Sequence, residues 1–123
     1  MLRIDRANNI IITQGNSAEI NITPLDEEGK PYELQEGDKV VFKVESCRKE
    51  IIRRVLTAED WDSEQDGLIM VLNPEDTVNL PCKEYKFDCL YIFADGSAKT
   101  FIPAAMFKVV KAIAKVGDGD AGA

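Results

Sequence analysis

Apolar and polar residues alternate with a period of two along much of the chain, a pattern typical of β-strands that bury one face. The helical period of 3.6 is not dominant anywhere in the sequence. The alternation predicts that three segments supply most of the core. Their inward residues are Ala18, Ile20 and Ile22; Val40, Phe42 and Val44; and Tyr85, Phe87, Cys89, Tyr91 and Phe93.

Turn residues separate these segments at intervals typical of antiparallel sheets. Asp95-Gly96 is the strongest hairpin signal, because glycine tolerates the positive φ that a primed turn requires. It predicts that Tyr85–Ala94 pairs antiparallel with Ser97–Pro103. Many short strands with regular turns indicate a sandwich or a barrel. We expect about eight strands: Asn9–Thr13, Ala18–Leu25, Lys39–Ser46, Glu50–Leu56, Leu68–Asn73, Tyr85–Ala94, Ala98–Ile102 and Met106–Ile113.

Two segments depart from the strand pattern. Thr57–Trp61 fits a single helical turn capped by Thr57. Residues 73–80 fit a helical turn better, because Asn73 can cap it and Pro74 suits its first position. We predict one domain over residues 1–116, followed by a flexible tail over residues 117–123 that lacks apolar content.

The acidic balance of the chain limits its partners. In 123 residues, Asp and Glu outnumber Lys and Arg by 22 to 15, which gives a formal net charge of −7. Nucleic acids and anionic membrane surfaces attract cationic proteins, so the sequence argues against both as partners. The N-terminus has no apolar run typical of a signal peptide, and we expect synthesis in the cytoplasm.

The residue types needed for common catalytic and metal sites are scarce. The chain has no histidine, so the Ser-His and Cys-His pairs of nucleophilic catalysis are unavailable. Its three cysteines, Cys47, Cys82 and Cys89, have spacings that fit no zinc motif, and we interpret them as small apolar core residues in a reducing compartment. No phosphate-binding glycine motif is present. We therefore expect neither an enzyme nor a cofactor.

One acidic loop resembles a calcium-binding loop in its order of residues. Asp62, Glu64 and Asp66 supply oxygen atoms at alternate positions, and a glycine follows. The twelfth position, however, is Asn73 rather than the bidentate Glu of an EF-hand. We keep these three acids as a weak metal candidate and interpret the segment as an acidic turn that leads into a strand.

Four apolar residues are candidates for an interaction surface. Trp61 lies between two aspartates and fits either an exposed binding aromatic or a cap on one end of the sandwich. Val41, Leu90 and Ile92 fall on the outward side of their predicted strands. If they gather, they form an apolar patch of the kind that marks a partner surface. Five charged residues are expected at an edge or on the outer face: Lys39, Lys43 and Glu45 on the segment of Val41, and Arg53 and Arg54 on the next segment.

The order of these segments resembles a known family. The relevant segments, in order, are Thr13-Gln14-Gly15-Asn16-Ser17 before the strand Ala18–Leu25, the turn Glu28–Leu34, Gly37–Val44, Asp66–Ile69, Leu72–Thr77 with Leu80, and Tyr85–Leu90 with Asp95-Gly96 and Thr100. Residues 9–112, taken together, resemble the immunoglobulin-like N-terminal domain of baseplate upper proteins and related tail proteins of phages and prophages.

The resemblance implies an all-β, antiparallel immunoglobulin-like sandwich of about seven to eight strands with one short helical turn. It implies a non-catalytic structural module of a phage tail or baseplate, whose partners are other tail proteins or further copies of the chain. Baseplate upper proteins continue into a shaft, whereas this sequence stops at Ala123, so their receptor-binding function is not carried over. The alternative function is a carbohydrate- or surface-binding module that uses Trp61.

Overall fold

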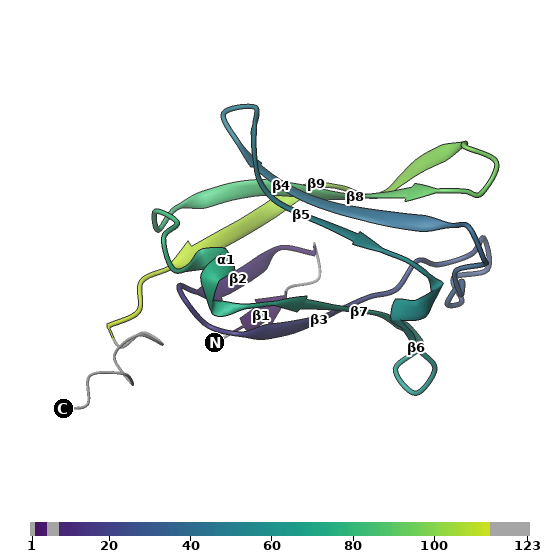
Figure 1. Ribbon diagram of the computed structural model, residues 1–123, viewed down its shortest axis with the longest axis horizontal. Coiled ribbons are helices and arrows are strands. Elements are labelled where there is room, and N and C mark those ends of the chain that lie inside the picture. The colour runs from purple at the N-terminus through teal and green to yellow at the C-terminus, as the bar shows by residue number, and fades with distance from the viewer. Residues whose placement is uncertain (1, 5–7, 114–123) are drawn as a thin grey trace.

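Two β-sheets packed face to face make up residues 2–4 and 8–113, the part of the chain that the computed structural model describes (Figure 1). The larger sheet has the strand order β1-β2-β9-β8-β4-β5, and the smaller sheet has the order β3-β7-β6. The strands are β1 (Leu2–Ile4), β2 (Ile10–Thr13), β3 (Ala18–Ile22), β4 (Lys39–Ser46), β5 (Lys49–Leu56), β6 (Trp61–Asp62), β7 (Gly67–Leu72), β8 (Glu84–Ile92) and β9 (Ala98–Val110). The predicted all-β sandwich is confirmed, and its strands pair antiparallel except for β2 and β9, which are parallel.

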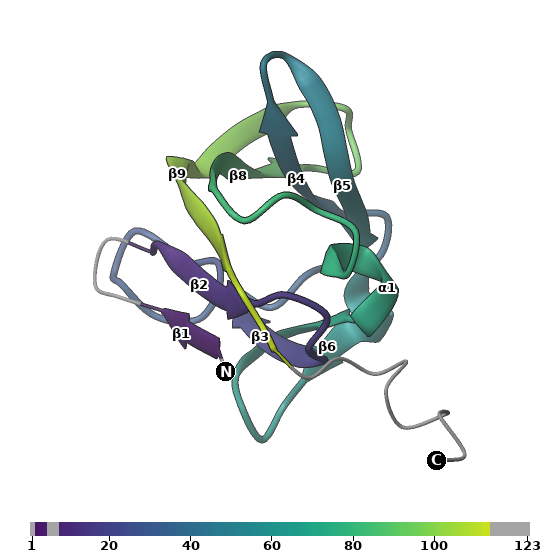
Figure 2. The same ribbon diagram turned by 90° about the vertical axis from the view of Figure 1, so that its left-hand side faces the viewer.

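The strand order is that of an immunoglobulin-like sandwich. In that fold, strands B, E and D form one sheet, and C, F and G form the other, to which variable-type domains add C′. Here β3, β7 and β6 take the places of B, E and D, and β4, β5, β8 and β9 take those of C, C′, F and G. Figure 2 shows β2 beside the C-terminal half of β9.

A tyrosine corner supports this assignment. Immunoglobulin domains carry a tyrosine near the start of strand F whose hydroxyl bonds to the backbone a few residues upstream. In β8 the Tyr85 hydroxyl donates a hydrogen bond of 2.7 Å to the carbonyl oxygen of Pro81. Two residues further on, where antibody domains have their second cysteine, this chain has the buried Phe87. The two sheets are therefore held together by packing at this position and not by a disulfide.

The core lies between the sheets, on the faces that the alternation predicts. Three phenylalanine rings form its centre: the centroids of Phe42 and Phe87 are 5.2 Å apart, and both rings contact Phe107 edge-on. All predicted inward residues of the three segments are buried except Phe93, which is half-buried. Each fully buried large side chain contributes about 1.5–3 kcal/mol of transfer free energy, so this interior supplies the main stabilisation of the fold.

The final strand differs from the prediction. Pro103 separates the two predicted segments 98–102 and 106–113, but β9 runs through it without a break. The register against β8 shifts between Phe87 and Cys89, whose partners are Ala105 and Ile102, so Pro103 lies at this irregularity. Bulges of this kind leave a residue unpaired in the ladder, so the missing N–H of proline costs little there.

The β8–β9 hairpin forms as expected but not with a primed turn. Phe93 N–H donates to the Ser97 carbonyl oxygen at 2.8 Å, which closes a three-residue loop. Gly96 has a φ of 92°, whereas Asp95 is not in the left-handed region. The hairpin therefore uses a turn followed by a left-handed glycine, the usual arrangement for three-residue loops.

Both predicted helical turns are present. Residues Ala58–Asp60 form a 3-10 turn, η1, and Pro74–Thr77 form the short helix α1, with Asn73 at its N-cap. No helix in the described ranges is long and apolar enough to span a membrane. The predicted tail over residues 117–123 lies outside the described part of the chain.

Arg54 does not lie on the outer face. Its register partner on β4 is Phe42, so it shares the inward side of β5. Because β5 is the edge strand, the Arg54 side chain can reach past the core to the carboxylate of Asp76 on α1, at 2.5 Å. Arg53 and Arg54 are consecutive residues of this edge strand and point to opposite faces, so the predicted edge position holds for both and the outer face only for Arg53.

Candidate interaction surface

The outer face of the larger sheet carries a row of apolar side chains that crosses three strands. In β4 the alternation that buries Phe42 turns Val41 outward. The register places Val41 opposite Leu90 of β8 and opposite Val55 of β5. Ile92 lies two residues beyond Leu90 on the same face. These four residues, Val41, Val55, Leu90 and Ile92, are called the outer patch.

The outer patch is accessible to a partner. Val55 is 48% exposed, and the other three side chains are half-buried by their neighbours on the sheet. The strand register thus brings Val41, Leu90 and Ile92 together, as the sequence predicts. Val55 was not predicted, although it lies two residues after Arg53 and therefore on the same outward face of its strand.

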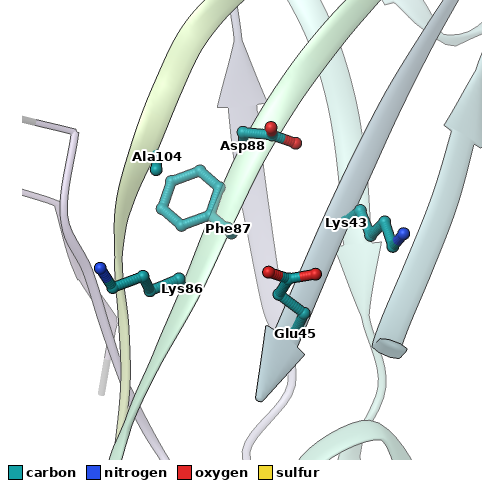
Figure 3. Close-up of a pocket in the computed structure, with 6 residues that line it drawn as sticks. All are labelled: Lys43, Glu45, Lys86, Phe87, Asp88 and Ala104. Carbon is teal, nitrogen blue, oxygen red and sulfur yellow. The ribbon is translucent and has the colours of Figure 1, made fainter. Parts of the chain in front are cut away.

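Charged side chains of both signs border the outer patch. Lys43 lies opposite Asp88 on β8 and opposite Arg53 on β5, and Glu45 lies opposite Lys86. Four of these residues, from the neighbouring strands β4 and β8, surround a shallow hollow beside the patch (Figure 3). An apolar centre with a polar rim is the usual composition of a protein–protein interface.

Trp61 does not belong to this surface. It lies on β6 in the smaller sheet, where it pairs with Leu68, and its ring packs partly against the core. An open, acidic hollow adjoins it, with Glu19, Asp62 and Glu64 among its lining residues. The structure thus brings three of the four predicted interaction residues together and leaves the fourth on the opposite sheet.

The loop that resembles a calcium site forms a hydrogen-bonded turn. The carboxylate oxygen Oδ1 of Asp62 accepts hydrogen bonds from the backbone N–H groups of Glu64 and Gln65, at 2.9 and 3.3 Å. Asp66 has a φ of 49°, and its carbonyl oxygen accepts a hydrogen bond from the Thr23 hydroxyl. Within the described ranges, no three acidic or cysteine residues are grouped so that they could hold a metal ion.

The three cysteines occupy different environments. Cys89 is buried between the sheets as predicted, but the core prediction is wrong for Cys47, which is exposed in the β4–β5 turn, and for Cys82, which is exposed before β8. Both lie in connecting segments, where no alternation directs a side chain inward. All three thiols are free. Burial, with a smaller contribution from the neighbouring Asp88 carboxylate, raises the pKa of Cys89 to about 12. This thiol is therefore an apolar core group rather than a nucleophile.

The fold and this surface define an immunoglobulin-like sandwich domain with an apolar patch on the outer face of its larger sheet. A scan against protein-family models and a search of curated proteins both find no match for this chain.

Proposed function

We propose that this domain is a non-catalytic assembly module that binds another protein through the outer patch. The observation that carries the proposal is the register, which aligns Val55, Val41 and Leu90 across three strands within a charged border. Aligned apolar side chains on an exposed sheet face lose unfavourable contact with water when a partner covers them. An exposed sheet face is suited to such contacts because its backbone is already ordered.

The resemblance of residues 9–112 to the tail and baseplate domains of phages supports a narrower proposal. In it, the partners are other tail or baseplate proteins, or further copies of this chain, and the domain is made in the cytoplasm and carried in the virion. The immunoglobulin-like topology agrees with this proposal, but folds of this class host many functions, so the topology is support of a general kind.

The outer patch favours assembly over the carbohydrate-binding alternative. A sugar-binding Trp presents an open ring face on which a sugar can stack, whereas Trp61 packs partly against the core. That packing supports the structural role of Trp61 as a cap on the sandwich. The acidic hollow beside it keeps the alternative testable.

The test uses two substitutions that are matched in chemistry and exposure. Val55 in the outer patch is 48% exposed and Val71, on the smaller sheet, is 47% exposed. Tailed particles are purified from the source bacterium after prophage induction, with the chain supplied in trans as wild type, Val55→Asp or Val71→Asp. We expect mass spectrometry to find the wild type and Val71→Asp at fixed stoichiometry with tail proteins, and Val55→Asp to be lost.

Two results would contradict the proposal. Absence of the wild-type chain from abundant intact particles would refute the virion role. Equal incorporation of Val55→Asp and Val71→Asp would refute the role of the outer patch. With either of these results, a change in Trp61 fluorescence on addition of saccharides would favour the carbohydrate-binding alternative.

A further inference from the structure

A second candidate surface lies at one end of the sandwich, where the β3–β4 loop meets the β8–β9 hairpin (Figure 1). In immunoglobulin variable domains the corresponding loops, B–C and F–G, belong to the end that carries the binding loops. An open groove at this end is lined mainly by apolar residues. We call it the loop-end groove, and its apolar lining consists of Pro24, Leu25, Tyr32, Tyr91, Phe93 and Phe101.

Aromatic rings form the floor and walls of this groove. Tyr91 is the central ring, with centroid distances of 4.6 Å to Phe93, 5.8 Å to Tyr32 and 6.4 Å to Phe101. Tyr91 itself is buried, whereas the other three rings are only partly covered. Leu25, at the rim, is 61% exposed, the highest value among the large hydrophobic residues within the described strands and the loops that join them. A large aliphatic side chain beside open rings indicates a surface that another molecule covers.

A buried carboxylate fixes the two sides of the groove to each other. Asp38, which is 5% exposed, accepts hydrogen bonds from the Tyr91 hydroxyl at 2.5 Å, the Ala94 N–H at 2.9 Å and the Gln35 N–H at 3.2 Å. These bonds join the β3–β4 loop to the β8–β9 hairpin. Because hydrogen bonds to a buried carboxylate are stronger than neutral ones, they hold the groove in one shape before any partner binds.

Close backbone packing reinforces this connection. Gly37 has a φ of 89°, and a Cβ atom at this position would lie 2.9 Å from the Cβ of Ala94. Only glycine permits both the conformation and the close approach of the loop to the hairpin. The groove is thus a built feature of the fold rather than a chance gap between two mobile loops.

The charge around the groove determines the kind of partner that fits it. Residues 24–38 contain six acidic residues and one lysine, so this loop accounts for much of the net charge of the chain. Asp26 and Glu27 lie in the lining of the groove itself, with Lys99 on the hairpin side. An acidic rim around an aromatic floor attracts cationic groups and repels nucleic acids and acidic surfaces.

We propose that the loop-end groove binds a segment of another protein that presents an aromatic or aliphatic side chain between basic residues. The apolar side chain packs among Leu25, Phe93 and Phe101, and the basic residues meet the carboxylates of the rim. Arg and Lys side chains also gain from contact with aromatic ring faces, which this groove offers.

This proposal is independent of the outer patch. Alternation along β8 places Leu90 and Ile92 on the outer face of the sheet and Tyr91 on the inner face, with Phe93 continuing the inner series. The two surfaces therefore share one hairpin but lie on opposite sides of it. Substitutions in one surface do not alter the other, and the two proposals can fail separately.

The probe is an amidated pentapeptide of alternating arginine and tryptophan residues. It is titrated into the isotopically labelled chain, with chemical shifts of backbone amides as the readout. Two matched peptides replace arginine by glutamate or tryptophan by glycine. We expect shifts confined to the β3–β4 loop and the β8–β9 hairpin, and an affinity at least about tenfold weaker for each matched peptide, since each removes one of the two contributions.

Two pairs of substitutions test the residues of the groove. Leu25→Ser should weaken peptide binding about five- to tenfold through lost apolar contact, whereas Val71→Ser on the smaller sheet should leave it unchanged. Glu27→Lys should weaken binding and reduce its dependence on salt, whereas Glu75→Lys on α1 should change neither to a comparable extent. Val55→Asp in the outer patch should bind the peptide as the wild type does.

Three results would overturn the proposal. Shifts spread over all acidic surfaces, with equal affinity for the glycine-substituted peptide, would show general charge attraction only. An unchanged affinity of Leu25→Ser would place the peptide outside the groove. Shifts of the groove amides with maltotriose or chitotriose but not with the peptide would assign the groove to a saccharide.

Discussion

Replacement of Tyr91 by Phe removes one hydroxyl group and should lower stability more than the same change at Tyr85. The Tyr91 hydroxyl donates to the carboxylate of Asp38, which is 5% exposed. The Tyr85 hydroxyl donates to the neutral carbonyl oxygen of Pro81. Hydrogen bonds to charged groups contribute about 1.5–3 kcal/mol, and those between neutral groups contribute about 0.5–1.5 kcal/mol.

The remaining partners of Asp38 do not compensate for the lost hydroxyl. In the Tyr91→Phe variant, oxygen Oδ2 keeps only the Gln35 N–H at 3.2 Å, and the aromatic ring still excludes water from that side. We therefore expect the free energy of unfolding to fall by about 2 kcal/mol for Tyr91→Phe and about 1 kcal/mol for Tyr85→Phe. For a domain of this size the first change lowers Tm by roughly 5–10 °C.

Urea unfolding, followed by the fluorescence of the single Trp61, measures both variants on one scale. The midpoint should shift by about 1 M urea for Tyr91→Phe, with an unchanged slope. Tyr32→Phe is the control, because its hydroxyl makes no hydrogen bond to the described part of the chain. If Tyr85→Phe costs as much as Tyr91→Phe, the carboxylate of Asp38 does not strengthen its bond, and the account of the loop-end groove as rigidly held is wrong.

Three further predictions follow from single positions. Gly37→Ala should cost about 1–2 kcal/mol more in urea unfolding than Gly29→Ala, because both have positive φ but only Gly37 lies against the hairpin. A thiol reagent at pH 8 should titrate the two exposed cysteines at once and Cys89 only after unfolding, because burial raises the pKa of Cys89 to about 12; three fast equivalents would contradict this. Burial, and next the hydrogen bond to Asp38, raise the pKa of the Tyr91 hydroxyl above its ordinary value. The stability that the neutral hydroxyl gives the fold is therefore fully present below about pH 10 and is lost as pH rises further, so the loss of stability at high pH should be smaller in Tyr91→Phe.

The strands were predictable because their alternation is regular and one face of each is buried. The predicted segment 39–46 matches β4, and the other interior strands differ from prediction by a few residues at their ends. The strand predicted as Ala18–Leu25 ends at Ile22, because Pro24 cannot donate to a ladder. Strands β1 and β6, of three and two residues, were missed because a period of two has no meaning over so short a length.

The two surfaces differ in how far the sequence reveals them. The outer patch follows from local alternation, since each of its residues is an apolar side chain at an outward position. The loop-end groove does not, because it depends on the approach of two segments separated by more than 50 residues in the chain, as in the bond from Ala94 N–H to Asp38. Tyr32 and Phe101 have no local signal that joins them. Contacts of this kind arise from the topology, which determines which loops meet at one end of the sandwich.

The balance of charge differs between the two surfaces, and this difference bears on how such a module joins its neighbours. Four cationic and three anionic side chains border the outer patch: Lys39, Lys43, Arg53, Lys86, Glu45, Glu50 and Asp88. The loop beside the groove carries an excess of acids. The mixed border of the outer patch can face a second surface of mixed charge, whereas the acidic groove suits a basic partner. Two unlike surfaces on one hairpin therefore suit an arrangement in which each module binds different neighbours on its two sides.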